Sequence, residues 1–236
     1  MFGKRGVIQT GATKRKTETS LRDPGAMSGL LTGVSFIAGV GGALALADSP
    51  YPRPGSEPAE VRRYFTENSR SARLSATGQL VSAAALARFT ASVAQLAGRL
   101  GRGSRGLQAA AIAGGGLAAA SLASSGLCAL ALSGRWGKDD DGAAMLARRA
   151  FAAGGPIHGA GFGVLTGVLA ISGLRTGELP RPVAITGLVS AASGLLSPLY
   201  FVKEQAGWFI PIGRFSGLLV SGIAGTLLSR CSGRRT

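Results

Sequence analysis

Residues 107–134, LQAAAIAGGGLAAASLASSGLCALALSG, are 28 consecutive positions without a charged side chain. About 20 apolar residues in a helix, at ~1.5 Å of rise each, cross the ~30 Å hydrocarbon core of a membrane. A stretch of this length and composition therefore predicts a transmembrane helix. Residues 27–47 form a second uncharged stretch of 21 residues, so the chain is expected to cross the membrane more than once.

The same pattern recurs along the chain and predicts an all-α integral membrane bundle of six transmembrane helices over residues 27–230. The expected spans are residues 27–47, 74–98, 107–133, 150–174, 183–202 and 207–229. A basic cytoplasmic tail at 1–26, expected to be disordered, precedes the bundle, and a cytoplasmic tail at 231–236 follows it. The first span ends in a segment, 45–47, that resembles a signal-peptidase site. The span is longer than the apolar h-region of a signal peptide, which has roughly 7–15 residues, and this favours an uncleaved anchor.

The longest predicted loop, residues 48–73, contains a segment whose apolar side chains have helical spacing. Tyr64 and Phe65 follow Val61 by three and four positions, with Arg62 and Arg63 between them. This pattern is typical of an amphipathic helix that lies at a membrane surface. We therefore expect a short outer helix that runs into the second span.

The composition is typical of a membrane protein with close helix contacts. Charged residues make up 16% of the chain, against ~25% in soluble domains, and there are 38 glycines. The net charge of +15 does not indicate a nucleic-acid partner, because the basic residues flank the spans, where they set topology and face anionic lipid. Membrane lipids are the expected partners, and a homo-oligomer or a membrane-protein partner stays open.

The basic residues also predict the orientation of the chain. With the amino terminus inside, the inner segments carry 14 Lys and Arg, the outer segments carry 10, and Arg88 and Arg214 lie within spans. Cytoplasmic loops are enriched in Lys and Arg. We therefore expect a multi-pass protein of the cell membrane with both termini in the cytoplasm.

Several kinds of chemistry lack the residues that they need. Cys128 and Cys231 have no second thiol or histidine at ligand spacing, so neither a disulfide framework nor a metal site is expected. All eleven Asp and Glu residues lie outside the expected spans, whereas proton-coupled carriers commonly use intramembrane carboxylates. The sequence predicts no metal and no cofactor, and it argues against carboxylate-driven transport.

Three polar residues within the expected spans form a candidate site. Arg88 either contacts an anion or lipid headgroup inside the bundle or snorkels to the inner headgroups, and we favour snorkelling. Ser125 and His158 are expected at similar depth, and such a pair resembles the rhomboid intramembrane proteases. The rhomboid serine lies in Gly-x-Ser-Gly, and Ala123 departs from that motif. We therefore favour an interhelical hydrogen bond for Ser125, and for His158 a hydrogen bond to a backbone group at a helix end distorted by Pro156.

One glycine pattern predicts close helix packing. Gly159, Gly163 and Gly167 are spaced by four on the fourth span, so they share one helix face. Such faces let membrane helices approach closely. We expect this face to form an interface, within the monomer or between protomers.

Two short motifs resemble a known family. AEVRRYFTEN at 59–68 and RTGELPR at 175–181, together with the order of the spans, resemble the domain-of-unknown-function 4386 family of bacterial multi-pass membrane proteins. The resemblance implies a fold and no reaction, because the family has no assigned activity. The long basic leader departs from the family pattern.

Three functions remain open from the sequence. We predict a non-enzymatic structural or interaction protein of the membrane. The first alternative is a small permease or lipid-handling protein with a polar cavity near Arg88. The second is an intramembrane serine hydrolase that uses Ser125 and His158, and we predict that the protein is not an enzyme.

Overall fold

The computed structural model describes residues 25–134 and 139–231. Within these residues the chain is helical, without a strand, and six helical segments are long and apolar enough to cross a membrane. The prediction of an all-α bundle is confirmed, while most of the two predicted tails lies outside the described residues. The main helices are α1 (Ser28–Leu46), α2 (Pro58–Glu67), α3 (Ser69–Gly98), α4 (Arg105–Leu132), α5 (Asp140–Ala152), α6 (His158–Thr176), α7 (Arg181–Leu196) and α8 (Phe209–Cys231).

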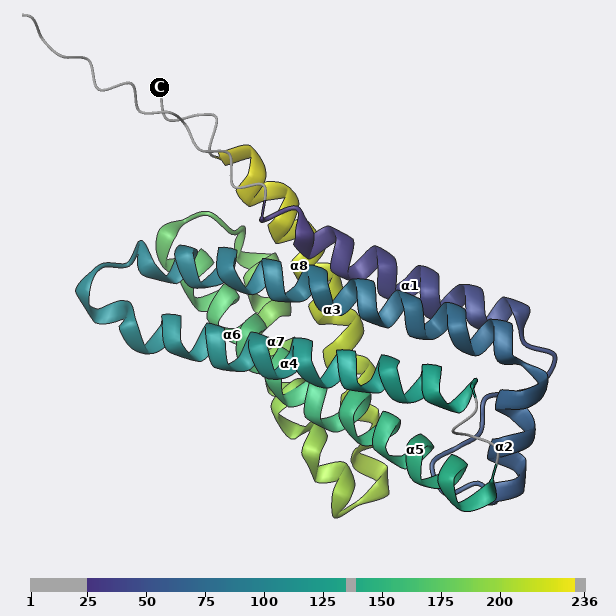
Figure 1. Ribbon diagram of the computed structural model, residues 1–236. Coiled ribbons are helices and arrows are strands. Elements are labelled where there is room, and N and C mark those ends of the chain that lie inside the picture. Colours follow the sequence, from purple (N-terminus) through teal and green to yellow (C-terminus); the bar gives the residue numbers. More distant parts are fainter. Residues whose placement is uncertain (1–24, 135–138, 232–236) are drawn as a thin grey trace, which may run out of the picture.

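The spanning helices form a closed ring of neighbours. Helix α3 lies between α1 and α4, α6 contacts α4 and α7, and α8 contacts both α7 and α1 (Figure 1). Large side chains from α3 and α6, including Phe89, Leu86 and Phe162, are fully buried between them. The ring therefore has an apolar core, as a bundle in hydrocarbon requires for tight van der Waals packing.

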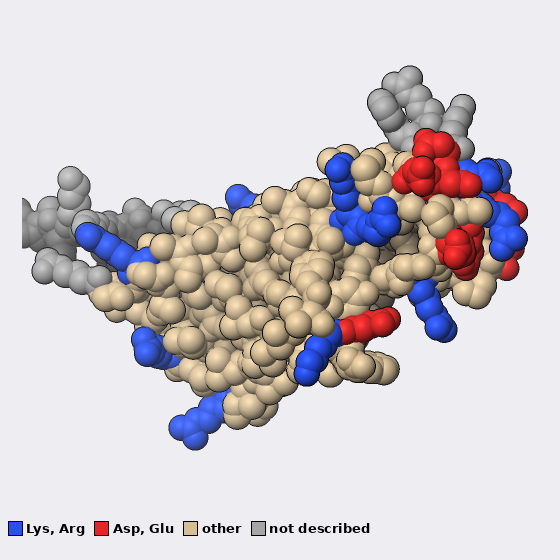
Figure 2. All heavy atoms as spheres, turned by 90° about the horizontal axis from the view of Figure 1, so that it is seen from below, with Lys and Arg blue, Asp and Glu red and all other residues tan. Residues whose placement is uncertain are grey.

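The bundle has two distinct ends. The α2 end carries α2, the start of α5 and two 3₁₀ segments, Ser197–Phe201 and Glu204–Trp208. The termini end carries the start of α1, the end of α8 and the turns at 99–104 and 177–180. Figure 2 shows acidic and basic side chains together at the α2 end and a largely uncharged surface along the body. This distribution is what a membrane-embedded middle requires, because charges are costly in hydrocarbon.

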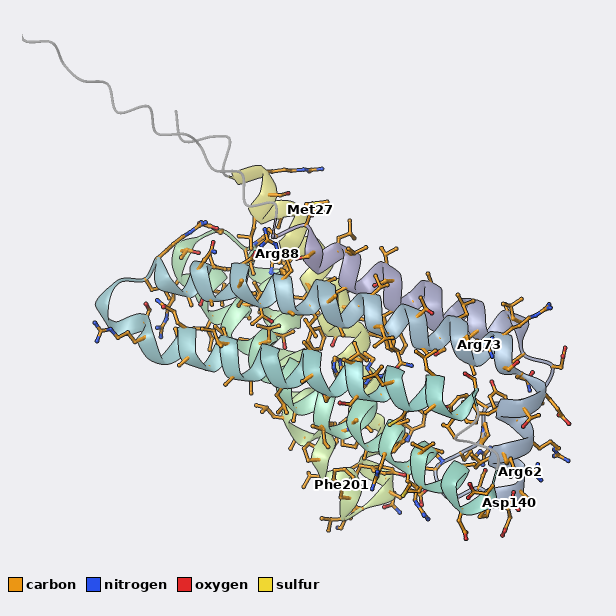
Figure 3. The ribbon with its side chains drawn as sticks, in the orientation of Figure 1. Met27, Arg62, Arg73, Arg88, Asp140 and Phe201 are labelled. Carbon is orange, nitrogen blue, oxygen red and sulfur yellow. The ribbon has the colours of Figure 1, made fainter. Side chains whose placement is uncertain are left out.

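Among the described residues, one ion pair joins neighbouring elements at each end. Arg62 of α2 pairs with Asp140 of α5 at 2.5 Å, and Figure 3 shows the two side chains together. Arg99 pairs with Glu178 at 2.6 Å at the termini end. Both pairs include exposed side chains, so each contributes little to stability on its own. They nevertheless show that the loops expected on one side of the membrane do meet.

Helix α2 is the short amphipathic helix that the sequence predicts. Pro58 occupies its first position, where a missing N–H costs nothing. Val61, Tyr64 and Phe65 are buried and pack with Leu132 and Ala143 of neighbouring helices. Its charged residues face outward, so α2 lies across the α2 end as a cover over the bundle.

Two helices begin earlier than the hydropathy pattern predicts. Helix α3 begins at Ser69 instead of 74, and its Ser71 hydroxyl donates to Ala43 O of α1 at 2.7 Å. The fourth span begins at Asp140 instead of 150, because Asp139 caps the helix by accepting from Gly142 N at 2.6 Å. Asp140 and the next aspartate thus lie in the first turn of this helix, where carboxylates are favoured.

Candidate functional site: a cavity between α1 and α8

Helices α1 and α8 touch at the termini end and separate toward the α2 end. A Cβ built on Gly29 would lie 2.5 Å from Ser221 O, so only glycine permits this approach. The contact continues to Phe36, whose ring lies 5.0 Å from the guanidinium carbon of Arg214. Beyond this point Val40 and Ile210 line a cavity on opposite sides. The two helices therefore form a V whose apex is the Phe36–Arg214 contact.

The V encloses a cavity of about 1030 Å³. Its back wall comes from α3, α4 and α5, and the segment 51–58 and α2 cover it at the α2 end. Small ligand pockets measure ~300–1,000 Å³, so this volume can hold an acyl chain as well as a headgroup. The walls are largely apolar, and residues that define them include Val40, Ala43, Ala129, Ala144, Ala147, Phe151 and Ile210.

The cavity reaches the surface on a side that is itself apolar. Leu44 of α1 and Phe201, on the facing 3₁₀ segment, both line it and are 62% and 58% exposed. Exposed apolar residues on a spanning helix face lipid tails. The opening is therefore bordered by side chains suited to acyl chains.

A wide helical turn supplies the floor of the cavity. Residues Ala153–Ile157 form a π-helical turn between α5 and α6, and Pro156 within it cannot donate a normal helical hydrogen bond. Gly154 O, in this turn, accepts a hydrogen bond from a terminal nitrogen of Arg214. Ser125 of α4 packs directly against Gly154, and Gln79 Oε1 of α3 lies 3.9 Å from where a Gly154 Cβ would stand. Three polar side chains thus meet at one turn.

The floor carries a positive charge without a negative partner. Among the described residues, no carboxylate lies within ion-pair distance of Arg214, and its Nε is buried without a hydrogen-bond acceptor. Two acidic residues line the cavity, Glu57 and Glu204, and both are exposed. Arginine stays protonated in proteins, so the cavity has a fixed cation at its floor.

Aromatic side chains close the cavity at the α2 end. The Tyr51 ring meets Tyr64 and Phe65 edge-on, with centroids 5.3 and 5.8 Å away. Tyr51 is 53% exposed because it borders the cavity. The protein around its hydroxyl nevertheless desolvates that group, which raises the pKa of Tyr51 to about 12. Tyr51 therefore remains a neutral phenol that can donate a hydrogen bond at the mouth.

Arg88 does not belong to this site. It is exposed on α3, and its neighbour Phe89 packs against Gly29, in the first turn of α1. Figure 3 shows Arg88 close to Met27 at the termini end. From there a long side chain can extend to the headgroup layer. The structure places the cavity at Arg214, so the predicted cavity at Arg88 is wrong in position.

Ser125 and His158 lie on neighbouring helices but face different surroundings. His158 is buried, its Nδ1 lies 2.9 Å from Ala118 O, and its ring stacks on Phe162. Because a carbonyl oxygen only accepts, Nδ1 carries the proton. Ala118 precedes Ser125 by seven residues, or ~10 Å along α4. In the described part of the chain no hydrogen bond joins the two side chains, and of the two only Ser125 lines the cavity.

The three spaced glycines of α6 face α7. A Cβ on Gly159 would lie 2.5 Å from Ser197 Oγ, and one on Gly163 would lie 2.9 Å from Ala191 O. Gly167 is less crowded, at 3.3 Å from the Ala191 Cβ. The face is therefore an interface within the monomer, between α6 and α7.

Sequence reasoning missed the central residues of the cavity. Arg214 was placed within a span but not among the candidate site residues, and Gln79 gave no signal because its role depends on which face of α3 it occupies. One signal was present: Arg214 follows the interfacial Trp208 by six residues, or ~9 Å of helix, which is deep for a charge.

The described residues contain no group of three His, Cys, Asp or Glu side chains that could hold a metal ion.

Comparisons of the chain with protein-family models, curated proteins and solved structures gave no match. The fold and its charge distribution alone define the class: the chain has six helices that suit a membrane, which makes it a multi-pass helical membrane protein. The resemblance to the domain-of-unknown-function 4386 family stays a prediction.

Proposed function

We propose that the protein is a lipid-handling membrane protein that binds an amphiphilic ligand in the cavity between α1 and α8. The observation that carries this proposal is the cavity itself, about 1030 Å³ in volume and lined by largely apolar walls, with the partly buried Arg214 at its floor. A purely structural bundle has no need of such a space, because membrane helices gain stability by close packing. An amphiphile matches both the walls and the floor.

The opening favours a ligand that comes from the bilayer. Leu44 and Phe201 border the cavity on a surface that would face acyl chains. A ligand that moves sideways from the membrane keeps its tail out of water throughout, so it loses no hydrophobic stabilisation on the way. Water-soluble substrates gain nothing from such an opening.

We propose binding without catalysis. Ser125 borders the cavity, but a serine acts as a nucleophile when a base takes its proton. His158 holds its Nδ1 proton against Ala118 O and stacks on Phe162, which suits a structural role. Binding therefore accounts for the polar floor better than hydrolysis does.

We further propose the cell membrane as the location, with both termini in the cytoplasm. Acidic side chains gather at the α2 end, whereas Glu178 is the acidic residue described at the termini end, among several arginines. The Lys and Arg tally of 14 against 10 supports the same orientation. The ligand would then be taken from the outer half of the membrane.

Filling the cavity tests the proposed function. Ala147 lines the cavity and is half-buried, so Ala147→Phe places a ring in that space without opening the core. We extract the unmodified protein in discs of native membrane. We expect one species of amphiphile to be enriched in these discs relative to its abundance in the whole membrane. The variant should lose this enrichment by about tenfold, a change of ~1.4 kcal/mol in binding. Lipid mass spectrometry of the purified discs gives the measurement.

A matched variant separates cavity filling from a general effect of bulk. Ala113→Phe introduces the same ring at an exposed position of α4, and we expect it to retain the enriched amphiphile. If the unmodified protein and both variants carry lipids only in their bulk ratio, the proposal is wrong.

A further inference from the structure

The guanidinium of Arg214 has more donors than the protein uses. Of its five N–H groups, one donates to Gly154 O, and Nε is buried without an acceptor in the described residues. The Phe36 ring covers one face of the side chain at 5.0 Å and stabilises the cation without neutralising it. A buried cation with open donors is costly in a membrane unless an anion or water meets it.

We propose that the amphiphile is a long-chain carboxylate, and that its carboxylate binds Arg214 at the floor while its chain follows the walls toward the opening. This inference rests on the proposed function and specifies its ligand. Arginine presents a planar fork of donors that matches the two oxygens of a carboxylate. The apolar walls formed by Val40, Phe151 and Ile210 then cover the chain.

The charge of the floor sets the charge of the ligand. Within the described part of the chain, the lining arginines other than Arg214 are Arg53 and Arg148, and both are exposed. The floor therefore offers one partly buried positive charge, which one negative charge balances. A headgroup with two or more charges would leave an unpaired anion in a low-dielectric site.

The close packing around the floor favours a small headgroup that ends in two oxygens, without a further substituent. Gly154 and Ser125 pack against each other on one side of Arg214, and Phe36 closes another. A phosphodiester headgroup carries a glycerol and a second substituent, which need space next to the anion. A carboxylate ends the molecule, so it fits the apex of the V. The Ser125 hydroxyl of α4 can donate a hydrogen bond to it.

Photolabelling with one probe and a matched pair of competitors tests the ligand class. The purified full chain is placed in discs of neutral phosphatidylcholine. It is then labelled, at a pH above 7, with palmitic acid that carries a diazirine in its chain. We expect labelled peptides from the cavity walls, and we expect unlabelled palmitate to compete at least about tenfold better than hexadecanol. This comparison needs no variant, so it holds even if a substitution prevents folding.

Two arginine variants assign the recognition to one side chain. Arg214→Gln should lower palmitate labelling about tenfold, whereas Arg88→Gln, which removes the same charge from an exposed position of α3, should not change it. Equal competition by palmitate and hexadecanol, or full labelling of Arg214→Gln, would overturn the carboxylate assignment.

The outcomes also separate this inference from the proposed function. If Ala147→Phe abolishes palmitate labelling while Arg214→Gln leaves it unchanged, the cavity binds amphiphiles and the charge recognition is wrong. If phosphatidylglycerol competes better than palmitate, the ligand is a phospholipid and the carboxylate assignment is wrong. If Ala147→Phe leaves labelling intact, the probes bind elsewhere and both ideas fail.

Discussion

Replacing Gly39 with valine is expected to destabilise the bundle strongly. Helices α1 and α3 cross at this residue, and a Cβ on Gly39 would lie 2.7 Å from the Gly78 Cα and 3.3 Å from Leu74 O. Both obstacles are backbone atoms, so no side chain can rotate away. Overpacking of a tight interface costs ~1–3 kcal/mol and sometimes more, and we expect at least about 2 kcal/mol here. The midpoint of detergent-induced unfolding, followed by circular dichroism, measures the loss.

The same helix provides the control for this substitution. Gly41 lies two residues further along α1, is exposed, and has open space where its Cβ would stand. Gly41→Val should change the free energy of unfolding by no more than about 0.5 kcal/mol. Equal stability of the two valine variants would show that α1 does not cross α3 as described.

The second large effect concerns which residues are accessible from each side of the membrane. Single cysteines are placed at Ser56, Gly103 and Lys203 in a background in which Cys128 and Cys231 are alanine. Ser56 and Lys203 lie at the α2 end, and Gly103 lies in the turn at the termini end. We expect a membrane-impermeant maleimide to label the first two on intact cells and Gly103→Cys only after permeabilisation. The difference should be all-or-none, because charged reagents do not cross hydrocarbon.

Each possible pattern of labelling has a clear meaning. Labelling of Gly103→Cys alone on intact cells would keep the bundle and reverse its orientation. Labelling of all three cysteines from one side would contradict the spanning role of α3. The experiment therefore tests the bundle and its orientation separately.

The sequence predicted the number and order of the spanning helices because hydropathy reports directly on the solvent. Residues 107–134 have no charge, and α4 occupies Arg105–Leu132. The helix starts were harder to predict. Helix α3 begins at Ser69 because a polar turn is held against α1 through Ser71, a long-range contact that no local pattern contains. Helix α5 extends to Asp140 for a similar reason, since Asp139 caps it outside the apolar stretch.

The candidate site could be predicted only in part. A sequence places an arginine at a depth, but it does not show which helix face meets which neighbour. Arg88 and Arg214 both lie in predicted spans, yet Arg88 is exposed while Arg214 lies at the apex between α1 and α8. That difference arises from the contact of Phe36 with Arg214, two residues far apart in the chain. The sequence placed both arginines within spans, but it did not show that Arg214 borders the cavity.

The glycines illustrate the same limit. The regular spacing of Gly159, Gly163 and Gly167 predicted a close helix face, and these residues do face α7. Gly39 and Gly78 form an equally tight crossing but belong to different helices and share no spacing motif. Only the fold brings such a pair together.

A cryo-electron microscopy map of the full chain in discs of native membrane lipid tests the central claim most directly. We predict an elongated density between α1 and α8, with one end within hydrogen-bond distance of the Arg214 guanidinium and with Val40 and Ile210 on either side. A map in which α1 packs against α8 along its whole length, so that Val40 touches Ile210 and no cavity remains, would contradict the claim.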